Sequence, residues 1–178
     1  LLLSLLLTFM VSAQEAYYTG VDLTKSGLEL KEELAIKTIA AHTNPLSYTP
    51  DIWEASKITD KDPLNSNNVL LIYGYDDSDG NYITDRSRSQ NLSGGTTGTN
   101  WNREHTYANS LANPKLEDTG KTGPPYAEAH NLRPSDVKMN SNRGNKKFGD
   151  GSGNAGDVSK GWYPGDEWKG DVARMMMY

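Results

Sequence analysis

The sequence predicts an α+β fold, with short central strands flanked by helices and joined by long loops rich in Gly, Asp and Ser. Three observations predict it. A helical pattern follows a capping box near the N-terminus, a continuous apolar run occupies residues 69–73, and a second helical pattern begins near residue 167. The length of 178 residues is enough for one domain with its own core and too short for two comfortable ones.

The N-terminal residues 1–13 form an apolar run that ends in the small residues Ser12 and Ala13, before polar Gln14. This pattern is typical of the end of a signal peptide, and the run is too short to span a bilayer; a buried core helix is the alternative. We therefore expect an exported protein, secreted or periplasmic, with a single domain over residues 14–178. Because the last helical pattern stops in mid-course, we expect that domain to be truncated at its C-terminus.

Two helices are expected before the apolar run. Ser26 and Glu29 have the spacing of a capping box, and the apolar residues between Leu30 and Ala40 recur at helical spacing, which predicts a buried stripe. A shorter helix is expected from about residue 49 to residue 58, with Pro50 at its first position. Trp53 is its expected core anchor.

The apolar run Val-Leu-Leu-Ile-Tyr at residues 69–73 predicts a strand buried on both faces. The Asp-rich stretch at residues 76–81 resembles half of a calcium loop. It lacks a Glu at the twelfth position, so a hairpin turn is favoured. Residues 87–100 and 149–161 are rich in Gly, Ser and polar residues, and we expect surface loops there.

The last expected helix runs from about residue 167 to the end of the chain. Asp166 is its expected N-cap, and Val172, Met175 and Met176 are expected to face the core.

The charge distribution is uneven. The formal net charge of −5 opposes binding to phosphate, but between residues 101 and 148 eight Lys and Arg face five Asp and Glu. This local excess predicts nucleic-acid binding through phosphate contacts without base reading, because nothing resembles a base-reading helix. The Gly-rich loops lack the pattern of a phosphate-cradling P-loop, and the absence of Cys excludes a disulfide scaffold. The expected phosphate-binding residues are Arg103, Arg133, Lys138, Lys146 and Lys147.

The same stretch contains residue types suited to phosphodiester hydrolysis. That reaction needs a base to activate water and a cation to neutralise developing charge. His105 is the candidate base, and Glu104 and Asn140 carry oxygens that suit Mg²⁺. Neighbours in a strand point to opposite faces, so Glu104 and His105 can serve one site only where the strand ends or bulges. A helix start at residues 134–136 would place Asn140 one turn inside that helix, on the same face as Arg143.

Three motifs resemble the bacterial endonuclease I family of secreted nucleases. They are Trp-Asn-Arg-Glu-His at residues 101–105, Ala-His-Asn-Leu-Arg-Pro-Ser-Asp at 129–136 and Asn-Ser-Asn-Arg-Gly-Asn-Lys-Lys-Phe at 140–148. The stretch Lys-Gly-Asp-Val-Ala-Arg at residues 169–174 is similar to the C-terminal helix of that family. The resemblance covers most of residues 27–178.

This resemblance implies a ββα-metal, or His-Me finger, site in which two strands and a helix hold one Mg²⁺, with Mn²⁺ or Ca²⁺ as substitutes. It implies that His105 is the general base, that Glu104 and Asn140 bind the metal, and that Arg143 or Arg174 steadies phosphate. His130, together with Glu128, is expected to support the second strand. The implied activity is cleavage of DNA, and possibly RNA, with little sequence preference, leaving 5′-phosphates.

Two other functions remain open from the residues alone. Export and the two Asp/Gly-rich loops also suit a calcium-stabilised adhesion module without catalysis. A carbohydrate hydrolase would need two nearby carboxylates, for which Glu104 and Glu128 are the obvious pair. For the nuclease, we expect nucleic acid as the substrate, no stable protein partner, no membrane span once the signal is removed, and a monomer.

Overall fold

A computed structural model describes residues 16–95, 98–118 and 125–178 of the chain. The chain divides into two compact units at Asn44 and Pro45, and each unit is described by itself. The single domain expected over residues 14–178 stays a prediction, and the signal peptide expected at residues 1–13 lies outside the described residues. Within the described residues, no helix has the length and apolar character needed to cross a membrane.

The first unit contains one long helix, α2 (Gly27–Ala41). Ser26 stands at its N-cap position with an extended backbone, as expected, but its side chain makes no capping hydrogen bond. The prediction of a buried stripe is wrong within this unit, because no residue of α2 is buried and Ile39 is 75% exposed. The physical reason is that the described part of this unit offers no second apolar layer. The contacts that α2 makes there are polar, such as the 2.7 Å ion pair of Glu33 with Lys25.

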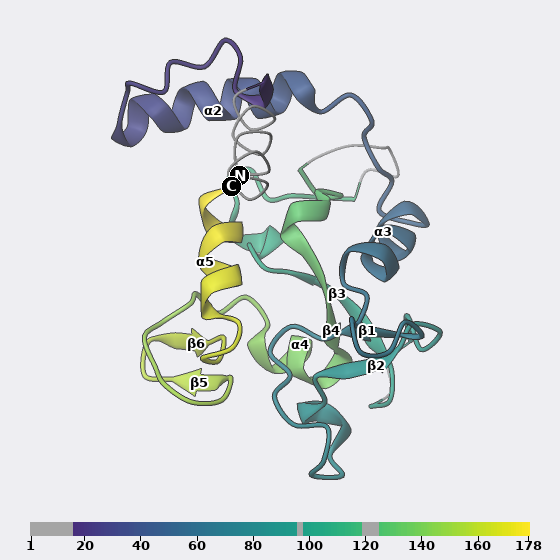
Figure 1. The fold of residues 1–178 in the computed structure, drawn as a ribbon. Coiled ribbons are helices and arrows are strands. Elements are labelled where there is room, and N and C mark those ends of the chain that lie inside the picture. The colour runs from purple at the N-terminus through teal and green to yellow at the C-terminus, as the bar shows by residue number, and fades with distance from the viewer. Residues whose placement is uncertain (1–15, 96–97, 119–124) are drawn as a thin grey trace, which may run out of the picture. The chain divides into compact units, whose positions relative to one another are not determined.

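The second unit is mixed α+β, as predicted (Figure 1). Its strands form three separate two-stranded antiparallel sheets, which pair β1 with β2, β3 with β4, and β5 with β6. The elements are α3 (Asp51–Thr59), β1 (Asn68–Leu70), β2 (Ser87–Ser89), β3 (Trp101–His105), β4 (Leu132–Asp136), α4 (Val137–Arg143), β5 (Gly156–Val158), β6 (Gly161–Tyr163) and α5 (Lys169–Met177), with short 3-10 turns at Tyr82–Thr84, Asn109–Leu111 and Ala129–Asn131.

The centre of this unit is the β3–β4 pair, which α4 follows without a loop. The register runs from Trp101 opposite Asp136 to His105 opposite Leu132. Asp136 ends β4 and caps α4, since its Oδ1 accepts hydrogen bonds from the backbone N–H groups of Lys138 (2.7 Å) and Met139 (2.9 Å). Figure 1 shows α4 at the foot of the two strands.

The helix start expected at residues 134–136 is therefore too early. Pro134 lies inside β4, opposite Arg103, and its carbonyl accepts a 2.8 Å hydrogen bond from the backbone N–H of Ile72. Proline lacks an N–H and fits this ladder position at no cost to the pairing with β3. The helix begins one residue after Asp136, and Asn140 still lies one turn inside it.

The apolar run at residues 69–73 is buried, as predicted, but only its first part is a strand. β1 ends at Leu70, and Tyr73 has a φ of +75°, in the left-handed region. The chain must turn there because Gly74 follows against the carbonyl oxygen of Asp85, which a Cβ on Gly74 would approach to 2.0 Å. Only glycine fits at that contact.

The largest apolar cluster lies where this run meets α4, β6 and α5. It comprises Ile72, Tyr73, Met139, Trp162, Trp168 and Val172. Trp162 belongs to the β5–β6 hairpin. Because β5 and the first residue of β6 fall within residues 149–161, the prediction that these residues form only a surface loop is wrong. The helix α5 starts at Lys169, two residues later than expected, and Asp166 does not cap it. In a separate cluster, Trp53 packs edge-on against Trp101 at 5.1 Å between ring centroids, and the buried residues of α3 are Ile52 and Ser56.

Candidate active site

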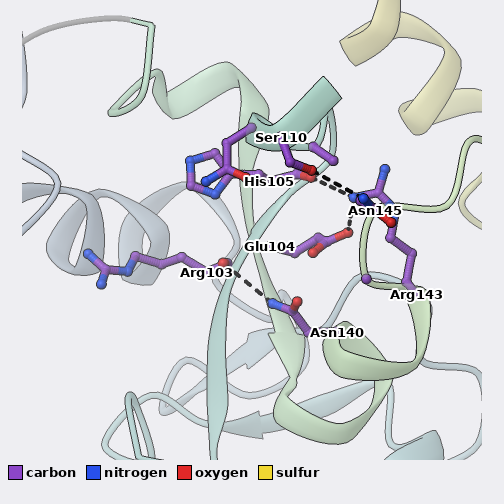
Figure 2. Close-up of a pocket in the computed structure, with 10 residues that line it drawn as sticks. Arg103, Glu104, His105, Ser110, Asn140, Arg143 and Asn145 are labelled. Atoms are coloured by element: carbon purple, nitrogen blue, oxygen red, sulfur yellow. Dashed lines mark hydrogen bonds and ion pairs between the residues drawn. The ribbon is translucent and has the colours of Figure 1, made fainter. Parts of the chain in front are cut away.

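A pocket of about 250 Å³ lies where β3 ends, between that strand and α4. Figure 2 shows it with its lining side chains. The structure brings together here five of the predicted site residues from two separate segments: Arg103, Glu104 and His105 of β3, and Asn140 and Arg143 of α4. The full lining is Arg103, Glu104, His105, Ala108, Asn109, Ser110, Asn140, Arg143, Gly144 and Asn145.

The alternation of a strand holds along β3. Arg103 and His105 share one face, since Tyr48 contacts both: the Arg103 guanidinium lies 3.5 Å from the Tyr48 ring centre, and the His105 ring stacks at 5.6 Å. Glu104 points to the opposite face, toward Arg143, as Figure 2 shows. Both faces reach the same pocket because β3 ends at His105. The condition expected from the sequence, a strand that ends at this pair, is present.

Glu104 is buried, with 2% of its surface exposed. Its Oε1 accepts hydrogen bonds from the Tyr73 hydroxyl (3.0 Å) and from Arg143 (2.8 Å), whereas Oε2 makes none with the described residues. Burial raises the pKa of Glu104 to about 7, although the Arg143 guanidinium and the Tyr73 hydrogen bond act in the opposite direction. The carboxylate is thus held through one oxygen and has the other available.

Asn140 offers a second oxygen to the same pocket. Its Nδ2 donates to the backbone carbonyl of Arg103 at 3.4 Å, and this fixes which way the amide faces. Its Oδ1 accepts no hydrogen bond from the described residues. One carboxylate oxygen and one amide oxygen are the ligand types of a hard divalent cation that keeps several waters. These residues fit such an ion, and within the described ranges no cluster of three or more His, Cys, Asp or Glu offers another metal site.

His105 is held in one orientation by the loop before β4. Its Nε2 lies 2.9 Å from the backbone carbonyl of Tyr126, and its ring packs against the Tyr126 ring at 4.7 Å. A carbonyl can only accept, so Nε2 carries the proton and Nδ1 keeps its lone pair. Burial lowers the pKa of His105, against the Tyr126 hydrogen bond, which raises it, and the Arg103 and Arg143 guanidiniums lower it further. A neutral imidazole with a free Nδ1 can act as a base.

The two arginines expected to steady phosphate are placed differently from one another. Arg143 is 2% exposed, and its NH groups donate to Glu104, to the carbonyl of His105 (2.7 Å) and to that of Thr106 (2.6 Å). Arg174 is exposed on α5, where it pairs with Asp171, and it does not line the pocket. Their role toward phosphate stays a prediction.

The predicted phosphate-binding residues fall into two groups. Arg103, Arg133 and Lys146 are engaged: Arg103 between the rings of Tyr48 and Trp53 and with Thr49, Arg133 with Asp60, and Lys146 with Asp157. Lys138 and Lys147 are exposed, and their side-chain ammonium groups have no hydrogen-bond or ion-pair partner among the described residues. These two lysines, at the start of α4 and just beyond its end, are available to an anion.

Glu128 and His130, which were expected to support the second strand, lie in the turn before β4, and their supporting role stays a prediction. Glu128 caps the turn at Ala129–Asn131, accepting hydrogen bonds from the His130 backbone N–H (2.9 Å) and from its Nδ1 (2.8 Å). This turn leads directly into β4. Glu128 does not line the pocket with Glu104, so the structure does not bring together the carboxylate pair that carbohydrate hydrolysis would need.

Sequence reasoning missed Tyr73 and Tyr126. Tyr73 was assigned only to the buried strand, yet a tyrosine in a fully apolar run carries a hydroxyl that needs a partner, and that was the available clue. Tyr126 acts through its backbone carbonyl, for which residue type gives no clue.

The fold and the pocket define the class: a ββα unit that presents a histidine, a carboxylate and an asparagine to one cavity. The family model described as Endonuclease I matches residues 26–178, and the chain belongs to that family, whose members are nucleases.

Two curated relatives match most of the chain. Both are named extracellular ribonuclease, one from Bacillus subtilis (strain 168), 42% identical over 170 residues, and one from Bacillus amyloliquefaciens, 41% identical over 170 residues. Each alignment covers 92% of this chain and 52% of the relative, so the chain spans about half the length of these relatives. No solved structure gives a significant match.

Proposed function

We propose that this chain carries the active site of an extracellular, metal-dependent nuclease that hydrolyses RNA and also accepts DNA, with little sequence preference. Two relatives named extracellular ribonuclease support RNA as the first substrate and export as the destination. The observation that carries the proposal is the pocket at the end of β3. It brings together Glu104 and Asn140, each with a side-chain oxygen that makes no hydrogen bond with the described residues, and the neutral imidazole of His105.

In the proposed mechanism, Glu104 and Asn140 would hold a divalent cation, Mg²⁺ or a substitute such as Mn²⁺, through the side-chain oxygens that make no hydrogen bond with the described residues. When bound, this cation neutralises the charge that develops on the phosphate and on the departing oxygen. His105 removes a proton from the attacking water at Nδ1, while Nε2 stays hydrogen-bonded to Tyr126. The bond between phosphorus and the 3′-oxygen breaks, the 3′-oxygen leaves and takes up a proton from water, and the phosphate stays on the 5′-oxygen of the downstream fragment.

Lys138 and Lys147 would hold flanking phosphates on either end of α4. Contacts of this kind recognise the backbone of any sequence, and they weaken steeply as salt rises.

The substrate assignment can be tested with three oligonucleotides of one sequence: RNA, DNA, and RNA with 2′-O-methyl groups throughout. Because the nucleophile is water and not the 2′-hydroxyl, we expect all three to be cut in the presence of Mg²⁺, to carry 5′-phosphate ends, and to survive in EDTA. RNA cleavage that continues in EDTA, or that needs a free 2′-hydroxyl and leaves cyclic phosphate, would contradict the proposed mechanism.

The base can be tested with His105→Ala, for which His130→Ala is the matched control. His130 is exposed, pairs with Glu128 and does not line the pocket. We expect His105→Ala to lower kcat by at least ~10²-fold, because a positioned base contributes about that much, while affinity for the oligonucleotide stays near the parental value. His130→Ala should keep activity within a few-fold. Equal losses in the two variants would argue against His105 as the base.

A further inference from the structure

We infer that Tyr73 and Arg143 are positioning residues, which together fix the Glu104 carboxylate so that only one oxygen is presented to the cation. This inference rests on the proposed function. It assigns a role in the same site to Tyr73, and it gives Arg143 a role other than the phosphate contact expected from the sequence. The starting observation is a strained backbone: within the described residues, Tyr73 is the single non-glycine residue with a positive φ (+75°), and it is fully buried.

A bulky residue in the left-handed region costs conformational free energy and persists only where its surroundings hold it. Both neighbours of Tyr73 are held. The Ile72 N–H donates to the carbonyl of Pro134 in β4 at 2.8 Å, and Gly74 lies against the backbone at Asp85. The conformation at Tyr73 is therefore imposed from both sides, and in this conformation the hydroxyl group reaches Glu104.

The ring and the hydroxyl of Tyr73 have separate partners. The ring packs in the core against Trp162 (5.8 Å between centroids) and Phe148 (6.3 Å), contacts that a phenylalanine would make equally well. The hydroxyl donates to Oε1 of Glu104 at 3.0 Å. Packing alone thus does not require a tyrosine here, whereas orienting the carboxylate does.

Arg143 approaches the same oxygen from α4. One of its NH groups donates both to Oε1 of Glu104 (2.8 Å) and to the carbonyl of His105 (2.7 Å), and the other to the carbonyl of Thr106 (2.6 Å). Figure 2 shows the guanidinium beside the carboxylate. One side chain thus ties the carboxylate to the backbone on which His105 stands.

The two oxygens of Glu104 therefore have different roles. Oε1 accepts two hydrogen bonds, so the carboxyl group cannot rotate freely, and Oε2, which accepts none from the described residues, is left for the cation. Partners that orient a metal ligand in this way typically change metal affinity about 10- to 100-fold when they are removed.

The test compares Tyr73→Phe with Tyr163→Phe. Tyr163 is the matched control because it is also buried and its hydroxyl also donates to a carboxylate, Asp166 at 2.5 Å, away from the pocket. Mn²⁺ binding to the free protein is measured by calorimetry. We expect Tyr73→Phe to raise the Mn²⁺ dissociation constant about 10-fold or more, and Tyr163→Phe to leave it unchanged.

Cleavage rates measured as a function of Mg²⁺ concentration provide a second test. For Tyr73→Phe, the Mg²⁺ concentration at half-maximal rate should rise by the same factor, while kcat at saturating Mg²⁺ stays near the parental value, since the base is untouched. Loss of stability alone would not produce this separation. Arg143→Lys keeps the charge but loses the planar fork, so it should weaken Mn²⁺ binding as well. If Arg143→Lys does not fold, Tyr73→Phe decides by itself.

Tyr73→Phe with the same Mn²⁺ affinity as Tyr163→Phe would overturn the inference and leave Tyr73 as a packing residue. Failure of the proposed function gives a different result, because the parent protein itself would then bind no Mn²⁺ and cut no oligonucleotide.

Discussion

Two buried ion pairs stand at different points of the β3–β4 hairpin, and they look alike at first. Arg88 pairs with Asp136 at 2.6 Å where α4 begins, and Arg143 pairs with Glu104 at 2.8 Å beside the pocket. All four side chains are no more than 4% exposed. In both pairs a carboxylate on the hairpin meets an arginine from another element.

The two pairs differ in whether the carboxylate has an oxygen without a hydrogen-bond partner. Asp136 uses both oxygens: Oδ2 accepts from Arg88, and Oδ1 accepts from two backbone N–H groups at the start of α4. Glu104 uses only Oε1. A buried carboxylate with every oxygen satisfied stabilises the fold, whereas one with an oxygen left over is costly unless something else binds there. The comparison therefore separates a structural pair from a ligand.

The largest expected effect is on the structural pair. Asp136→Asn keeps the shape but removes the charge opposite Arg88, which stays buried, so we expect the free energy of unfolding to fall by roughly 3–5 kcal/mol. Urea denaturation followed by circular dichroism measures this. A loss under ~1 kcal/mol would show that Asp85 and the backbone carbonyls around Arg88 satisfy it without Asp136.

The isosteric change at the site should cost less. Burial raises the pKa of Glu104 to about 7, so the folded chain disfavours its charge and a neutral Gln relieves that cost, but Gln also leaves the buried Arg143 guanidinium without a counter-charge. We therefore expect Glu104→Gln to lower the free energy of unfolding at pH 8 by less than Asp136→Asn does. Metal affinity should instead fall by at least about 10-fold, because the anionic ligand is gone. If Glu104→Gln destabilises the protein as much as Asp136→Asn does, Glu104 is a structural residue and the distinction fails.

Local patterns in the sequence predicted much of the fold. The helix α3 and the final helix α5 were placed to within about two residues, and the apolar run was correctly expected to be buried. Two features were not predictable from local pattern. The β5–β6 strands are three residues long in a Gly-rich stretch and form around buried Trp162, which is a tertiary effect. The stripe of α2 has helical spacing, but spacing does not tell whether a second layer exists to bury it.

For the site, the sequence predicted the residue types that line the pocket, because Glu104, His105 and Asn140 stand in recognisable motifs. It could not tell which cations remain available. Arg103 and Arg143 look like phosphate ligands in sequence, yet their partners are aromatic rings, carbonyls and a carboxylate from distant segments. Lys138 and Lys147 are distinguished from them only by exposure, which depends on the tertiary fold.

The smallest expected effect concerns a third buried carboxylate, Asp60, which pairs with Arg133 and accepts from the Thr59 hydroxyl at 2.8 Å. Burial raises the pKa of Asp60 above its ordinary value of 3.8, although Arg133 opposes the shift. Asp60 thus resembles Glu104 in its raised pKa. It resembles Asp136 in that both of its carboxylate oxygens have partners. It lines no part of the pocket. If an unbonded oxygen is what marks a ligand, Asp60→Asn should leave Mn²⁺ affinity unchanged.

The same variant has a pH signature whose sign follows from the raised pKa. Between pH 3.8 and its folded pKa, folded Asp60 holds a proton that the unfolded chain has released, so its contribution to stability is present below that window and lost as pH rises through it. The stability of the parent minus that of Asp60→Asn should therefore fall across this window in urea titrations. If this stability difference instead grows with pH, the attraction to Arg133 outweighs the effect of burial. Asp60 would then resemble Asp136, as a carboxylate whose charge stabilises the fold.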